Sequence, residues 1–142
     1  AFTDADTRVP PDWLSAQLGC AADVFCGVVE VGDWRDFRPE TRKAFMDTEI
    51  RCDGHPHVHG ANLGMSAAAY LAAGGFSTRT SSEDVALVCA LEDAGMHIAR
   101  LVTPVVNTSA RRDARATGGF SDYLIRLEAA VMAMSPVSSK NA

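Results

Sequence analysis

The first residues able to do chemistry are Asp4 and Asp6, near the start of the chain. In an extended segment, residues i and i+2 face the same side, so both carboxylates would point at one spot. Carboxylate oxygens suit Mg²⁺ and Mn²⁺, which often keep waters and substrate phosphates in their coordination shell. Asp and Thr also form turns readily, so the pair alone is more typical of a surface turn than of a metal site.

A second group alternates along the chain as His55, His57 and His59. If this segment is extended, as Pro56 favours, all three imidazoles project to one side. Imidazole nitrogens suit zinc, copper or nickel. Two other interpretations stay open: a polar loop that borders an acceptor pocket, with His59 contacting the substrate, and no shared role.

Two charged pairs lie further along the chain. Asp84 follows Glu83 at the start of a predicted helix, and Ser81-x-x-Asp84 matches a capping box in which Ser81 is the N-cap. Acids in a first helical turn also complement the helix dipole. Arg111 and Arg112 follow a predicted strand, where guanidinium groups could pair with phosphate oxygens or simply face solvent.

Strands alternate with helices along the sequence, which indicates an α/β sheet. The hydrophobic pattern predicts strands at 24–31, 97–102 and 105–108, the last two separated by Pro104. It predicts helices at 12–18, 39–52, 67–73, 82–94 and 120–134. So few strands would make an incomplete open sheet with flanking helices. We expect one domain over 1–134 and a flexible tail over 135–142.

Composition narrows the class of protein. The chain has 142 residues and a formal net charge of -5, which argues against nucleic acid as a partner. No apolar run approaches the roughly 18–20 residues that a transmembrane segment needs. The four cysteines are far apart and form no CxxC pair, so we expect a reduced, cytoplasmic protein.

Taken in order, the motifs resemble those of family 2 glycosyltransferases. The resemblance covers about residues 2–120 and is weakest over 33–56. It rests on five stretches, namely Thr3-Asp4-Ala5-Asp6-Thr7, Pro10-Pro11-Asp12-Trp13-Leu14, Gly60-Ala61-Asn62-Leu63-Gly64-Met65-Ser66, Tyr70-Leu71-Ala72-Ala73-Gly74-Gly75-Phe76 and Ser82-Glu83-Asp84-Val85-Ala86-Leu87. It implies a GT-A fold and an enzyme that transfers a sugar from a nucleotide-sugar donor to an acceptor hydroxyl, with inversion.

The resemblance also implies residue roles. Asp4 and Asp6 would hold Mg²⁺ or Mn²⁺ and the donor diphosphate, and Asp84 would deprotonate the acceptor hydroxyl. The other substrate-binding candidates are His59, Gly60, Ala61, Asn62, Glu83, Arg111 and Arg112.

The sequence departs from the family in two ways. The nucleotide-binding first half that precedes the DxD motif in the family is absent, so we expect an incomplete GT-A sheet and an inactive isolated chain. The QxxRW motif of processive members is absent too, which argues against a polysaccharide synthase. Two rival hypotheses are a non-catalytic metal- or ligand-binding module that uses His55 to His59, and an assembly domain that forms a homodimer through its open sheet edge.

Overall fold

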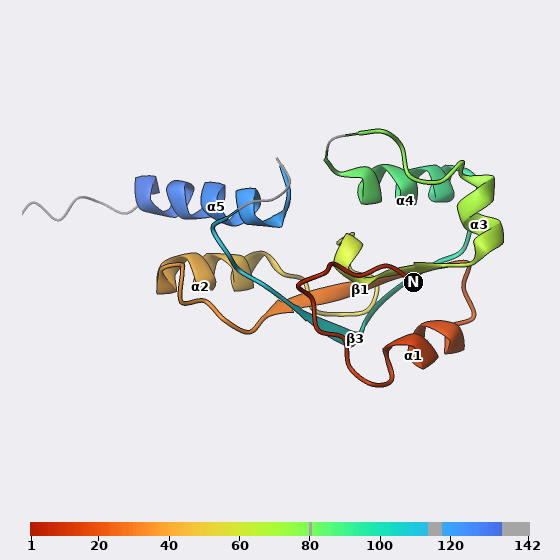
Figure 1. The fold of residues 1–142 in the computed structure, drawn as a ribbon, viewed down its shortest axis with the longest axis horizontal. Coiled ribbons are helices and arrows are strands. Elements are labelled where there is room, and N and C mark those ends of the chain that lie inside the picture. The colour runs from red at the N-terminus through yellow and green to blue at the C-terminus, as the bar shows by residue number, and fades with distance from the viewer. Residues whose placement is uncertain (80, 114–117, 135–142) are drawn as a thin grey trace, which may run out of the picture.

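The computed structural model describes residues 1–79, 81–113 and 118–134, so the predicted tail at 135–142 lies outside the described residues. Within them the chain is a mixed α/β protein with a three-stranded sheet (Figure 1). The elements in chain order are α1 (Trp13–Gly19), β1 (Val24–Val31), α2 (Pro39–Thr48), η1 (Gly60–Asn62), β2 (Leu63–Met65), α3 (Ala67–Ala72), α4 (Glu83–Asp93), β3 (Ile98–Thr108) and α5 (Phe120–Met134).

The strands lie in the order β2-β1-β3. Central β1 is antiparallel to β2, with Cys26 opposite Leu63, and parallel to β3, with Val31 opposite Thr108. Every residue of β1 except Glu30 is buried, so both faces of this strand are covered. A strand that is covered on both faces typically has a continuous apolar sequence without alternation, and residues 24–31 have this pattern.

The prediction of two strands on either side of Pro104 is wrong, because β3 is continuous from Ile98 to Thr108. Its pairing with β1 nevertheless slips there: Gly27 lies opposite Leu101, and Val29 lies opposite Val106. Proline has no N–H to donate to the ladder, so the hydrogen-bonded pairing breaks at this point without ending the strand.

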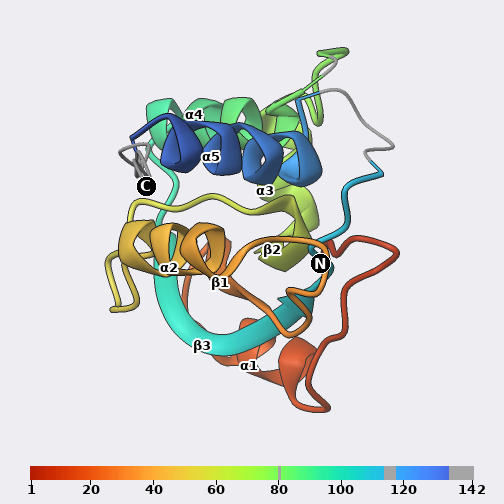
Figure 2. The ribbon, with the colours of Figure 1, turned by 90° about the vertical axis from the view of Figure 1, so that its left-hand side faces the viewer.

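Three apolar clusters join the helices to the sheet. The first packs α3 and α4 onto β1 and β2, and the second packs Trp13 of α1 against Val29 of β1 and Val106 of β3. The third joins α2 and α5 through Phe45 and Leu124. Accordingly, α4 and α5 lie on one side of the strands and α1 lies on the other (Figures 1 and 2).

Helix α2 is shorter than predicted. It ends at Thr48 rather than near Cys52, because Glu49 leaves the helical conformation and the chain turns away. Ile50, which the pattern assigns to the buried face, is 48% exposed. The segment released in this way carries the histidines of residues 55–59 back toward the sheet.

The expectations about transmembrane segments and about the cysteines can be compared with the described residues. No helix among them is long and apolar enough to cross a membrane. All four cysteines are free thiols: Cys26 is fully buried, and burial raises the pKa of its thiol to about 11.

Candidate functional site

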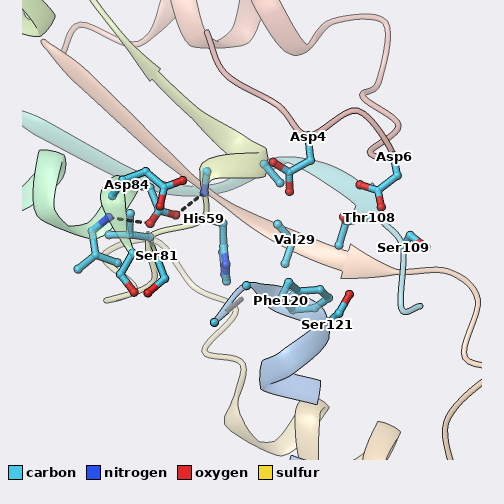
Figure 3. Close-up of a pocket in the computed structure, with 18 of the residues that line it drawn as sticks. Asp4, Asp6, Val29, His59, Ser81, Asp84, Thr108, Ser109, Phe120 and Ser121 are labelled. Atoms are coloured by element: carbon cyan, nitrogen blue, oxygen red, sulfur yellow. Dashed lines mark hydrogen bonds between the residues drawn. The ribbon is translucent and has the colours of Figure 1, made fainter. Parts of the chain in front are cut away.

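A cavity of about 500 Å³ lies where the carboxyl ends of the parallel strands β1 and β3 meet (Figure 3). Open α/β sheets commonly bind ligands at this edge. Six separate stretches of chain line the cavity, at residues 4–6, 29, 58–61, 81–85, 108–111 (without residue 110) and 118–121. Side chains far apart in the sequence therefore face one space.

Two helices begin at the cavity. Residues 82–85 at the start of α4 and residues 118–121 at the start of α5 both line it. The two N-terminal ends approach each other in Figure 1. The positive ends of two helix dipoles thus face the cavity, which favours a bound anion.

The N-terminal segment reaches the cavity because it is attached to both outer strands. Phe2 forms a β-bridge with Leu63 of β2, and Arg8 forms one with Asn107 of β3. Asp4 and Asp6 lie between these two attachments, and both line the cavity (Figure 3). The extended conformation predicted for them is wrong, since the stretch makes a turn closed by the hydrogen bond from the Thr7 N–H to the Asp4 carbonyl, 3.1 Å.

Negative charge dominates the cavity wall. Burial raises the pKa of the Asp4 carboxyl, and the neighbouring carboxylates of Asp6, Asp84 and Glu83 raise it further, with only Arg111 opposing them. These carboxylates are therefore near enough to repel one another. Carboxylate oxygens around an open, polar space are the donor set that Mg²⁺ and Mn²⁺ prefer.

Asp84 is not a capping-box residue. Helix α4 begins at Glu83, so Ser82 rather than Ser81 is the N-cap, and its side chain makes no capping hydrogen bond. Asp84 instead accepts hydrogen bonds from the Gly60 N–H at Oδ2, 2.7 Å, and from the Val85 N–H at Oδ1, 2.8 Å. Each oxygen keeps a second acceptor position, so the carboxylate is fixed in place and can still accept a proton.

Gly60 brings its backbone close to Asp84. A Cβ atom at Gly60 would lie 3.3 Å from Asp84 Oδ2, so any larger residue crowds the hydrogen bond. His59 and Ala61 line the cavity on either side of Gly60, and the His59 ring extends toward Phe120 at the start of α5 (Figure 3).

Asn62, the third residue of the Gly60-Ala61-Asn62 motif, lies outside the cavity. It is fully buried, and its amide nitrogen donates to the carbonyls of Val28 and Pro104, 2.8 and 2.9 Å. Its oxygen accepts from Trp13 Nε1, 2.9 Å. Asn62 thus satisfies two backbone carbonyls at the point where the pairing of β1 with β3 changes register. Gly27 leaves room for it, because a Cβ there would collide with the Asn62 amide.

The neighbouring arginines have different surroundings. Arg111 lines the cavity and pairs with Asp6, 3.0 Å, while its Nε is buried without a hydrogen-bond partner among the described residues. Arg112 lies elsewhere: its guanidinium stands 4.6 Å from the centre of the Phe37 ring and pairs with Glu128 on α5. The hydrogen bond from Arg112 lowers the pKa of Glu128, and the structure brings only Arg111 to the site.

The three histidines point to one side, as predicted, and their rings stack with centroids 5.6 Å apart in each neighbouring pair. Glu49, just past the end of α2, lies against His57 and His59. The sequence analysis missed Glu49. The only sequence signal would have been an acid at the end of a predicted helix that leads into a histidine-rich segment.

The cavity therefore combines oxygen ligands for a hard cation, a guanidinium and two helix starts for an anion, and an anchored carboxylate for a proton. Of the predicted site residues, Asp4, Asp6, His59, Gly60, Ala61, Glu83, Asp84 and Arg111 line it, and Asn62 and Arg112 do not. Comparison of the chain with family models, curated proteins and solved structures finds no match in any of the three.

Proposed function

We propose that the chain is the metal-binding and acceptor-side portion of a family 2-like, GT-A-type glycosyltransferase. The observation that carries the proposal is the convergence of Asp4, Asp6, Asp84 and Arg111 on one cavity at the carboxyl edge of parallel strands. The motif order alone did not require them to share a space. Transfer of a sugar from a donor with a diphosphate leaving group needs the three kinds of group found there: oxygen ligands for a metal, a cation for the phosphates and a carboxylate that accepts a proton.

Asp4 and Asp6 are the proposed ligands of Mg²⁺ or Mn²⁺, which supplies positive charge to a leaving diphosphate. Repulsion among the cavity acids supports this assignment, because a bound cation would relieve it. Arg111 offers a buried Nε that has no partner among the described residues, and an oxyanion of the same phosphates would satisfy this donor. The starts of α4 and α5 add backbone N–H groups.

Asp84 is the proposed general base. Its two backbone hydrogen bonds orient the carboxylate toward the cavity without using all its acceptor positions. An acceptor hydroxyl held near Asp84 would lose its proton there while its oxygen attacks the sugar carbon and the bond to the diphosphate breaks. Attack opposite the leaving group inverts the configuration at that carbon.

Binding of Mn²⁺ to the chain, followed by electron paramagnetic resonance with and without UDP, GDP or pyrophosphate, tests the proposal. We expect a nucleoside diphosphate to tighten Mn²⁺ binding, because metal and phosphate share the site. Asp4→Asn and Asp6→Asn should each weaken the ternary complex by about tenfold or more. Asp93→Asn, at the exposed far end of α4, is the matched control and should bind like the unaltered chain.

Two outcomes count against the proposal. Mn²⁺ affinity that is the same with and without every diphosphate would remove the link between metal and leaving group. Equal losses in Asp93→Asn and Asp4→Asn would show that the effect comes from net charge rather than from the cavity.

A further inference from the structure

A second cluster of metal-ligating side chains stands at the wall of the cavity, at Glu49, His57 and His59. Glu49 Oε2 lies 4.0 Å from His57 Nε2 and 3.8 Å from His59 Nε2. One ligand atom from each of the three residues fits within 4.8 Å of the others, a property that no other group of three such residues shares in the described part of the chain.

The cluster is buried and incompletely satisfied. The Glu49 side chain is only 5% exposed and the two histidine side chains are 18% exposed. Glu49 Oε2 and His59 Nε2 are both buried, and neither has a hydrogen-bond partner among the described residues. A buried carboxylate oxygen without a partner is costly, so a group that accepts its lone pairs would stabilise the fold.

We propose that Glu49, His57 and His59 form a binding site for a divalent transition-metal ion of the zinc type. Two imidazoles and one carboxylate make a ligand set with an open coordination position, as in catalytic zinc sites and in sites for Fe²⁺. Mg²⁺ and Mn²⁺ prefer oxygen ligands and fit the Asp4–Asp6 side of the cavity better.

Modest movements would complete the site. Ligand bonds of about 2.0–2.2 Å in a tetrahedral site place neighbouring ligand atoms about 3.3 Å apart. The Glu49–His59 and Glu49–His57 separations of 3.8 and 4.0 Å are close to that value. His57 Nε2 now accepts a hydrogen bond from the Ile50 N–H, 2.9 Å, which the metal would replace. Ile50 is half exposed, so water can take over its N–H.

The cluster adjoins the cavity through one residue. His59 lines the cavity and is also one of the three ligands. This inference does not rest on the proposed glycosyl transfer, because it uses none of the residues at Asp4, Asp6 or Asp84.

Calorimetric titration of the metal-free chain with Zn²⁺ tests the site, with Mg²⁺ and Fe²⁺ under anaerobic conditions as comparison ions. We expect saturable one-to-one Zn²⁺ binding at micromolar concentrations or below. His57→Gln and His59→Gln should each weaken Zn²⁺ binding at least about 100-fold. That loss is larger than is usual for a residue that only hydrogen-bonds to a metal ligand. Bound Co²⁺ should show intense visible absorption in the unaltered chain alone.

Matched variants separate this site from the acidic one. His97→Gln changes an exposed histidine outside the cluster and should keep full Zn²⁺ affinity, as should the double variant Asp4→Asn with Asp6→Asn. Circular dichroism checks that each variant is folded, and Zn²⁺ should raise the thermal midpoint of the unaltered chain but not of His59→Gln. The proposal is overturned if the unaltered chain shows no one-to-one binding, or if His57→Gln and His59→Gln bind Zn²⁺ as tightly as the unaltered chain.

Discussion

The acidic side of the cavity and the histidine cluster at its wall are adjacent but chemically opposite. Asp4 and Asp6 lie on an N-terminal turn beside Arg111 and offer hard oxygen ligands to an open space. Glu49 and the histidines are shielded from solvent and offer mainly imidazole nitrogen. A hard cation that keeps its waters and carries a phosphate suits the first side, and a softer ion held by protein atoms suits the second.

The difference would allow two proposed sites with different metal preferences to lie side by side. Oxygen ligands on an open turn can follow a ligand as it enters and leaves. Glu49 follows the end of α2, and His57 and His59 lie in the segment that leads to β2. Their side chains are largely buried, so the surrounding residues hold them in place. We therefore expect substitutions on one side to leave the metal selectivity of the other unchanged.

The largest effect should come from Asp84→Asn. An amide can still accept the Gly60 N–H but cannot take a proton, so glycosyl transfer by the complete enzyme, with its nucleotide-binding half, should fall by at least about 100-fold. Zn²⁺ affinity at the histidine cluster should not change. Initial rates with saturating donor and acceptor measure the effect, and Asp93→Asn serves as the control. A loss below threefold with normal donor affinity would contradict the assignment.

The two adjacent arginines provide a smaller and sharper test. Arg111→Ala should weaken the Mn²⁺–diphosphate complex by about tenfold, or about 1.4 kcal/mol, with little change in stability because its ion pair with Asp6 is partly exposed to solvent. Arg112→Ala should leave that affinity intact. It should lower the free energy of unfolding by about 1–3 kcal/mol, since buried Glu128 loses its charged partner.

Chemical denaturation and Mn²⁺ titration of both variants measure this difference. If Arg112→Ala lost diphosphate affinity while remaining folded, the assignment of Arg111 alone to the site would be wrong. Arg112→Lys keeps the charge near Glu128 and should recover part of the lost stability.

Much of the fold could be predicted because its signals are local. The apolar run of β1 and the amphipathic pattern of α5 gave the observed bounds. The predicted strand break at Pro104 could not be judged locally, because Asn62 satisfies the Val28 and Pro104 carbonyls at the slipped pairing from 34 and 42 residues away. Helix α2 ends early because the following chain packs elsewhere, which is again a tertiary effect.

The candidate site divides in the same way. Residues adjacent in the sequence need not have the same environment. Asn62 and Arg112 each follow a cavity residue, yet they contact Trp13 and Glu128 away from the cavity. The converse holds for Glu49, whose role depends on a chain reversal that brings the histidines against it. Spacing predicted that the histidines would share a side, but it carried no information about the acid they face.

The smallest predicted effect compares Asp4 with Asp6. The raised pKa of Asp4 means that its ionised form is disfavoured in the folded state, so the fold loses stability as pH rises through that pKa. Asp4→Asn should therefore raise the thermal midpoint at pH 7 by about 1–3 °C, and the gain should vanish below about pH 4, where the carboxyl is protonated in both states.

Asp6→Asn should act in the opposite direction, because it removes the 3.0 Å ion pair with Arg111 and relieves less repulsion. Its thermal midpoint at pH 7 should be equal to or slightly below that of the unaltered chain. Thermal melts of both variants between pH 4 and 8 without metal test the pair. Added Mn²⁺ with a diphosphate should reverse the ranking of Asp4→Asn and the unaltered chain, because the carboxylate that destabilises the empty cavity is the one that binds the ion. A pH-independent gain for Asp4→Asn would mean that its stabilisation comes from packing rather than from charge.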